Sequence, residues 1–279
     1  ADIAHHAGIS YHMRSWAIDE QPDAQTVKAI LQENKSITHV AMVHSETTSG
    51  ILNDVQSIGR VVKEAGATFI VDAMSSFAGV DIPVREWGID CIISSANKCI
   101  QGVPGFAYVI VRKDLLAACE GNARSLSLDL YDQWKTMNVD GKWRFTSPTH
   151  VVLAFAKAME ELETEGGIAA RHERYAANEK LLRKKLSALG FIPFLEQDVQ
   201  GPIITTFYYP AGCNFSFHEM YDYIKERGYI LYPGKTTKAE TFRVGNIGEI
   251  YREDIDKLAD LLSDFLDSKH KVGGQAVLG

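Results

Sequence analysis

Cysteine is scarce in this chain, and its pattern argues against two classes of small protein. The four cysteines among 279 residues, Cys91, Cys99, Cys119 and Cys213, include no Cys-X-X-Cys pair. Disulfide-stapled scaffolds are short and dense in cysteine, and structural zinc sites use closely spaced ligand pairs. We therefore expect reduced thiols, no metal site and a cytoplasmic location.

Long basic runs and long apolar runs are also missing. Lys and Arg total 29 against 36 Asp and Glu, which gives a net charge of -7 at pH 7. Proteins that follow nucleic-acid phosphates carry the opposite balance. No apolar stretch approaches the roughly 20 residues that a membrane-spanning helix needs. We expect neither nucleic acid nor a membrane as a partner.

What the chain does contain is the composition of a globular protein, with 46% hydrophobic and 23% charged residues. Its length is about twice the roughly 150 residues of an average domain, so one large or two ordinary domains are expected.

Short apolar runs in the first half of the chain end in polar residues. They alternate with helical patterns, which predicts an α/β layer with a sheet that is at least partly parallel. In such sheets ligands bind at the carboxyl ends of the strands, so His44, Asp72 and Lys98 are expected around one crevice. The predicted strands are residues 37–44, 68–71, 90–93 and 106–111.

The chain changes character after Gly166 and Gly167, which interrupt a helical pattern. Strands and helices are mixed from there on, which predicts a smaller α+β domain. We expect a large domain over residues 1–165 and a small domain over 166–279. The predicted elements of the small domain are strands at 203–208, 229–232 and 242–244, and helices at 217–227 and 253–266.

Lys98 and Asp72 are the candidate catalytic residues. Lys98 follows an apolar strand and precedes a turn-rich segment, so its amine would be partly desolvated; desolvation favours the neutral form, which condenses with aldehydes. Asp72 would supply an anion against a pyridine nitrogen, as pyridoxal phosphate chemistry requires. The alternative is that Lys98 is a solvated loop lysine and Asp72 caps a helix.

Seven motifs, in order and spacing, resemble the class V aminotransferases of the fold type I pyridoxal phosphate enzymes. They are HVAMVHSETTSG, FIVDAMSSFAG, SSANKCIQGVPGF, SLSLDLYDQW, KWRFTSPTH, LYPGK and FRVGNIGE. The resemblance implies a large domain with a mainly parallel sheet of the seven-stranded type, N-terminally incomplete, and pyridoxal 5'-phosphate as cofactor. It also implies transfer of the amino group of 2-aminoethylphosphonate to pyruvate, giving phosphonoacetaldehyde and L-alanine.

The resemblance implies a role for each site residue. Lys98 would bind the cofactor covalently, Asp72 would hold the pyridine nitrogen, and Thr47 would place a hydroxyl near the phenolic oxygen. Arg243 would bind the substrate anion, and Thr146 would reach the cofactor phosphate of a neighbouring subunit, which implies a homodimer. From the residues alone, Thr47 also fits a turn hydroxyl, Thr146 fits helix-start chemistry, and Arg243 fits a surface ion pair with Glu240 or Glu249.

The chain departs from the family at its N-terminal side. We find no match for the Gly-Ser/Thr-rich phosphate cradle or for the aromatic residue that stacks on the cofactor ring, so we expect part of the N-terminal region to be absent, in a cropped record or a real fragment. The alternatives are an alanine:glyoxylate or serine:pyruvate aminotransferase and a non-catalytic dimerisation or regulatory fragment. Cysteine desulfurase chemistry is disfavoured, because Cys99 beside the lysine is poorly placed for a mobile nucleophile.

Overall fold

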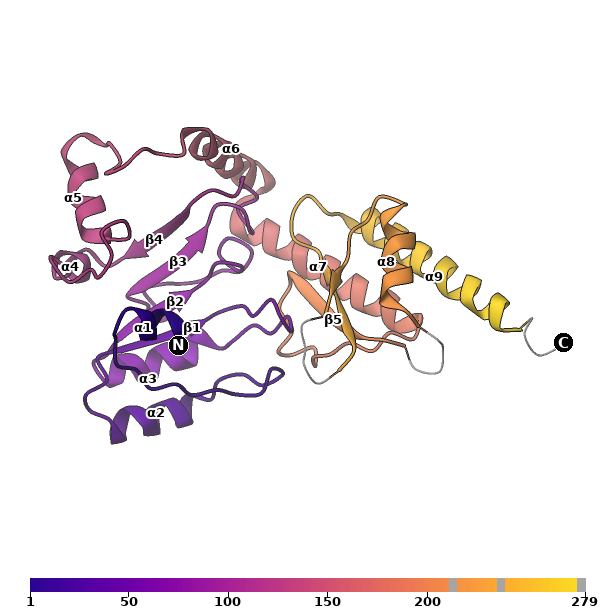
Figure 1. The fold of residues 1–279 in the computed structure, drawn as a ribbon, viewed down its shortest axis with the longest axis horizontal. Coiled ribbons are helices and arrows are strands. Elements are labelled where there is room, and N and C mark those ends of the chain that lie inside the picture. The colour runs from indigo at the N-terminus through magenta and orange to yellow at the C-terminus, as the bar shows by residue number, and fades with distance from the viewer. Residues whose placement is uncertain (211–214, 235–238, 275–279) are drawn as a thin grey trace.

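The first half of the chain forms a four-stranded sheet in the order β1-β2-β3-β4 (Figure 1). The computed structural model describes residues 1–210, 215–234 and 239–274. The strands are β1 (His39–Val43), β2 (Thr68–Asp72), β3 (Cys91–Ser95) and β4 (Ala107–Val111). The first three are parallel, and β4 runs antiparallel to β3. The predicted α/β layer with a partly parallel sheet is confirmed.

The strand register places the carboxyl ends of the parallel strands side by side. Val43 pairs with Asp72, and Asp72 pairs with Ile93, so the residues after β1, β2 and β3 leave the sheet at one edge. Parallel strands need covered faces, which their apolar runs anticipate. Here the central strand β2 buries Phe69 and Val71 completely.

Two capped helices cover one face of this sheet. Asp23 caps α2 (Ala24–Glu33), and Asp54 caps α3 (Val55–Glu64) by accepting the Ser57 amide hydrogen. A capping carboxylate satisfies amide hydrogens that have no partner inside the helix. The apolar stripe of α3 packs on β2 in a core that includes Ile58, Val62 and Phe69.

The remaining helices of this half are α1 (Asp2–His6), α4 (Lys113–Ala117), α5 (Leu130–Asp140) and α6 (Thr149–Glu165). Helix α6 ends at Gly166 with φ of 112°, and α7 (Gly167–Ala188) follows directly. Both Gly166 and Gly167 have positive φ, a conformation that glycine adopts without the steric cost other residues bear. The break predicted at this pair is confirmed.

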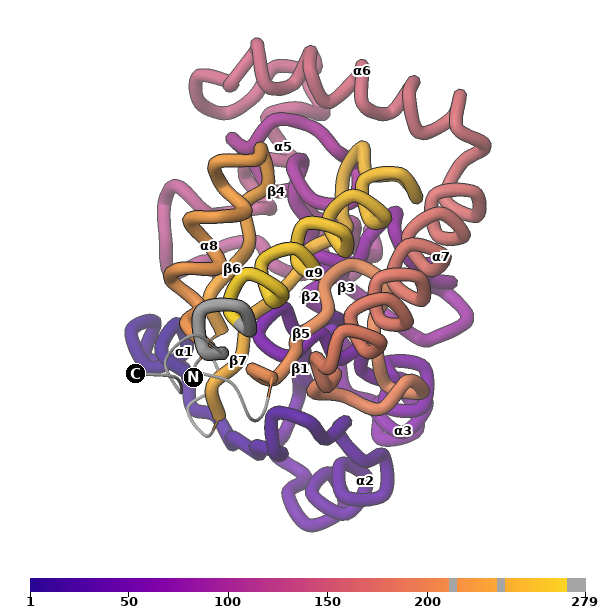
Figure 2. The backbone as a smooth tube through the Cα atoms, turned by 90° about the vertical axis from the view of Figure 1, so that its right-hand side faces the viewer, coloured from indigo at the N-terminus to yellow at the C-terminus, as the bar shows by residue number. Residues whose placement is uncertain are grey.

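Helix α7 leads into the second layer, where a three-stranded sheet has the order β5-β7-β6. Helices α7, α8 and α9 pack on one another, and α7 also packs on β5. In the view of Figure 2, α8 and α9 lie in front of the strands. Its elements are β5 (Ile204–Tyr208), α8 (Phe217–Lys225), β6 (Tyr232–Pro233), β7 (Thr241–Gly245) and α9 (Arg252–Gly274).

Each layer has a main core of its own, and a small buried cluster of Cys99, Tyr175, Ile203 and Ile204 connects the two. The predicted division at residues 165 and 166 stays a prediction. The core of the second layer gathers residues from α7, β5, β7, α8 and α9, among them Leu182, Phe207 and Leu262. The strand predicted at 229–232 pairs only at Tyr232 and Pro233. Of the residues named from the sequence, Cys213 and the Lys235 of LYPGK lie outside the described ranges.

Candidate active site

Asp72 ends β2 and begins a tight turn. Its Oδ1 atom accepts a hydrogen bond from the Met74 amide at 2.9 Å. The Asp72 carboxylate therefore caps a turn. The alternative that it caps a helix is wrong. The side chain is half-buried and forms no ion pair with any described residue. Its second oxygen is left for another partner at the carboxyl edge of the sheet.

Lys98 lies in the turn after β3. The Gln101 amide donates to the Lys98 carbonyl and the Gly102 amide to the Ala96 carbonyl, both at 2.8 Å. Gln101 has φ of 67°, in the left-handed region that side chains other than glycine rarely adopt. Lys98 is half-buried, and its amine has no hydrogen bond or ion pair with the part of the chain that the structure describes.

The loop after β1 carries Thr47 and closes on itself. The Glu46 amide donates to the Ile51 carbonyl, and the Gly50 amide donates to the Glu46 carbonyl. Burial, followed by the charge of Asp72, raises the pKa of the Glu46 carboxyl, which places Glu46 near the end of β2. The Ser45 hydroxyl is buried here and has no hydrogen-bond partner among the residues that the structure describes. A buried polar atom without a partner costs free energy unless a ligand or water satisfies it.

Arg243 joins the second layer to this loop. From β7, its Nη1 donates to the Thr47 carbonyl at 2.7 Å and its Nε donates to the Pro233 carbonyl at 3.2 Å. The residue is 6% exposed, and burial lowers the pKa of the guanidinium. The alternative of an ion pair with Glu240 or Glu249 does not hold, because Arg243 forms no ion pair with either of these described carboxylates and Glu249 pairs with Arg174.

His44 and Cys99 are packed. His44 Nδ1 lies 2.9 Å from the Ser76 hydroxyl, and burial lowers the pKa of its imidazole to about 4, so the ring is neutral at pH 7. Burial raises the pKa of the Cys99 thiol to about 12. A thiol protonated at neutral pH is a poor nucleophile, which agrees with the expectation against cysteine desulfurase chemistry.

Thr146 is the one predicted site residue that the structure does not bring to this edge. It is exposed in the segment before α6. Its side chain has no hydrogen bond with any described residue of the chain.

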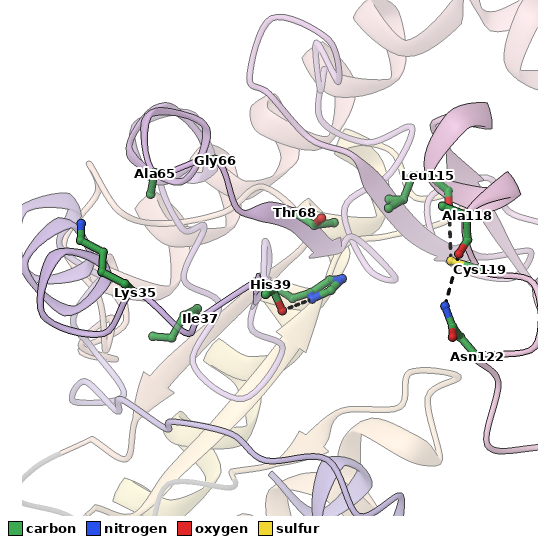
Figure 3. A pocket seen from close by; sticks show the side chains of 11 residues that line it. Lys35, Ile37, His39, Ala65, Gly66, Thr68, Leu115, Ala118, Cys119 and Asn122 are labelled. Atoms are coloured by element: carbon green, nitrogen blue, oxygen red, sulfur yellow. Dashed lines mark hydrogen bonds between the residues drawn. The ribbon is translucent and has the colours of Figure 1, made fainter.

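A cavity of about 510 Å³ lies at the other end of the strands (Figure 3). It is lined by the first residues of β1 and β2, His39 and Thr68, and by Leu115 and Cys119 from the α4 region. No predicted site residue lines it, so it is separate from the candidate active site.

Comparisons with known proteins identify the family of this chain. The family model described as aminotransferase class-V matches residues 1–253. The 2-aminoethylphosphonate–pyruvate transaminase of Lysinibacillus sphaericus is 54% identical over 252 residues, covering 90% of this chain and 69% of the relative. The protein of the same name from Bacillus cereus is 51% identical over 264 residues, 94% of this chain and 71% of the relative.

Two solved structures show the same fold at lower identity. Alanine–glyoxylate aminotransferase from Nostoc sp. superposes with a TM-score of 0.84 at 22% identity, covering 95% of this chain and 71% of that one. Ureidoglycine-glyoxylate aminotransferase from Bacillus subtilis gives 0.83 at 24%, covering 96% and 70%. The architecture is therefore that of the fold type I pyridoxal phosphate enzymes. The chain belongs to the class V aminotransferase family.

The family implies pyridoxal 5'-phosphate, and the residues at the carboxyl edge fit it. They offer an amine for its aldehyde at Lys98, a carboxylate oxygen for its pyridine nitrogen at Asp72 and a partnerless buried hydroxyl at Ser45. None of these groups is engaged by an opposite charge within the described residues. Ser45 was not singled out from the sequence, although its place directly after the predicted strand at 37–44 was a usable signal.

Proposed function

We propose that this chain transfers the amino group of 2-aminoethylphosphonate to pyruvate, forming phosphonoacetaldehyde and L-alanine. The names of relatives at 51–54% identity supply the substrates. The structural observation that carries the proposal is Arg243, a buried guanidinium whose contacts among the described residues are the Thr47 and Pro233 carbonyls and the Tyr232 ring. A buried cation with donors to spare is suited to binding an anion.

Arg243 serves both halves of the reaction in this proposal. One substrate carries a phosphonate and the other a carboxylate, and a guanidinium fork binds the oxygens of either group. The anion sits where the backbone of β7 fixes the guanidinium, so each substrate presents its reacting carbon in the same place. Burial excludes water and strengthens this electrostatic contact.

Lys98 and Asp72 carry the chemistry. When bound, pyridoxal phosphate supplies an electron sink for the negative charge that develops on the substrate carbon. The Lys98 amine would hold the cofactor through its aldehyde, and its Nζ would accept and return the proton that moves during the transfer. The Asp72 carboxylate holds a proton on the pyridine nitrogen. Thr47 would donate its hydroxyl hydrogen to the phenolic oxygen.

A homodimer in the cytoplasm completes the proposal. Four large side chains between residues 126 and 153 are mostly exposed: Leu126 at 75%, Leu128 at 78%, Val139 at 84% and Leu153 at 65%. Exposed apolar side chains gathered in one stretch of chain suggest a surface that a second subunit covers. Thr146 lies within the same segment, so a second subunit docked here would bring this hydroxyl to the partner's cofactor phosphate. No helix in the described part is long and apolar enough to span a membrane.

The proposal is tested by measuring L-alanine formation from 2-aminoethylphosphonate and pyruvate with added cofactor. We expect turnover that Lys98→Ala abolishes and that Lys28→Ala leaves unchanged, because Lys28 is an exposed lysine paired with Glu64 on the outer helices. Arg243→Gln should raise KM for both substrates by about a hundredfold, as loss of a charged hydrogen bond predicts.

Parallel assays with other donors and acceptors separate the alternatives. Suppose that the chain turns over L-alanine with glyoxylate, or L-serine with pyruvate, and does not turn over the phosphonate. Its substrates would then be carboxylates only, and the proposed phosphonate substrate would be wrong. Absence of turnover with every donor would favour a non-catalytic dimerisation or regulatory role.

A further inference from the structure

The turn that holds Lys98 is fixed from outside by a residue of α7. Arg171 Nη1 donates to the Cys99 carbonyl at 2.8 Å and to the Ile100 carbonyl at 3.3 Å, the two carbonyls that directly follow Lys98. Arg171 is 1% exposed and is among the largest fully buried side chains described. These contacts span more than 70 residues of sequence, so local chain geometry alone does not produce them.

The charge of Arg171 is balanced by one carboxylate that it shares with a neighbour. Its Nε and Nη2 lie 2.8 and 2.7 Å from Glu165 Oε2, and the Nε of Arg174 lies 2.8 Å from Glu165 Oε1. Arg174 directs its Nη1 elsewhere, to the carbonyls of Gly248 and Ile250. Two arginines on the same helix and the same carboxylate therefore hold two different loops.

Two further contacts tie the Lys98 turn to its surroundings. Gln101, with its positive φ, donates from its side-chain Nε2 to the Tyr175 hydroxyl at 2.7 Å. The Cys99 thiol donates to the Ser75 carbonyl at 3.1 Å, which connects this turn to the turn after Asp72. Gly79 permits this packing, because a Cβ at that position would lie 2.4 Å from the Cys99 sulfur.

We propose that Arg171 is a positioning residue for the aminotransferase reaction, holding the main chain directly after Lys98 so that the lysine amine points to one place. This inference rests on the proposed function of Lys98. A Lys side chain has four rotatable bonds, so precise placement of Nζ depends on a fixed backbone. Without Arg171, two buried carbonyls lose their donors, and the strained φ at Gln101 loses part of the structure that maintains it.

The first test is amide hydrogen exchange on the cofactor-free chain, because it reports the turn whether or not the enzyme turns over. In Arg171→Met, exchange in residues 97–103 should rise by about tenfold or more, while the core of the second layer stays as protected as before. Arg174→Met is the matched control, and its exchange should rise in residues 244–251 instead. Equal changes in both variants, or no local change in Arg171→Met, would overturn the proposal.

The second test is a split between kcat and KM. Arg171→Met should lower kcat by between about tenfold and a hundredfold, because a misplaced reacting group costs that much. KM for pyruvate should stay within about twofold, because Arg243 is untouched. Arg171→Lys keeps the charge beside Glu165 and one donor for the carbonyls, so it should recover part of kcat. If Arg171→Met does not fold, Arg171→Lys takes its place in both tests.

Failure of the proposed function gives a different pattern. If the unaltered chain makes no L-alanine, the substrate assignment fails, and the exchange result alone decides whether Arg171 fixes the turn. If the unaltered chain is active and Arg171→Met matches its kcat, Arg171 is not a positioning residue.

Discussion

Residue pairs that are far apart in sequence decide the chemistry of this site. Arg243 donates to the Thr47 carbonyl across 196 positions, and no local pattern reveals that contact. Lys98 and Asp72 were accessible from the sequence because each follows an apolar strand, and strand ends of a parallel sheet meet at one edge. The sequence left open a surface ion pair for Arg243, and only the burial of Arg243 in the structure excludes it.

His44 gives a pH prediction at the same scale. Burial lowers the pKa of its imidazole to about 4, whereas an unfolded His titrates near about 6.5. Above about pH 6.5 neither the folded nor the unfolded state binds a proton at His44, so the free energy of unfolding has its full value. As the pH falls toward 4, the unfolded state takes up the proton first, and the free energy of unfolding should drop by on the order of 3 kcal/mol.

Urea denaturation of the unaltered chain and of His44→Gln between pH 7.5 and pH 4.5 measures this slope. We expect a shallower loss of stability in His44→Gln and an unchanged slope in His39→Gln, because His39 is exposed. Parallel curves for the chain and His44→Gln would show that His44 is not the buried neutral group described above.

At the scale of elements, the sequence located most strands to within a few residues. Apolar runs bounded by polar and glycine-rich segments marked β1 to β5 and β7. The strand at 229–232 was placed too early, because only Tyr232 and Pro233 pair with β7 and Pro233 has no amide hydrogen to extend the ladder. Helix α2 was missed, although the Asp23 cap is a usual N-terminal signal.

The exposed apolar face around α5 and α6 yields a prediction about assembly. If it is the dimer interface, placing a charge there should separate the subunits, because a buried unpaired charge opposes association. Val139→Glu should therefore sediment as a monomer at micromolar concentrations at which the unaltered chain is a dimer. Ile192→Glu is the control, since Ile192 is 58% exposed but lies in the second layer.

Sedimentation velocity separates the outcomes. A dimer that persists in Val139→Glu would place the interface elsewhere, and a monomeric unaltered chain would contradict the homodimer.

At the scale of the whole molecule, α7 belongs to both layers. Its first turns hold the Lys98 turn through Arg171 and Tyr175, and its later residues Leu182 and Leu186 pack in the core of the second layer. Tyr175 also accepts a hydrogen bond from the Gly248 amide, just after the strand that carries Arg243. A domain boundary at Gly166 predicts one core on each side of it. It does not predict that helix α7 contacts both the Lys98 turn and the chain just after the strand that carries Arg243.

The central claim is that Lys98 is the residue that attaches the cofactor, and it has a direct measurement. The chain is incubated with pyridoxal phosphate, reduced with borohydride and digested, and the peptides are mapped by mass spectrometry. The account predicts a reduced cofactor on the peptide containing Lys98, lost when 2-aminoethylphosphonate is added before reduction and regained when pyruvate follows. A cofactor fixed on another lysine, or on none, would contradict it.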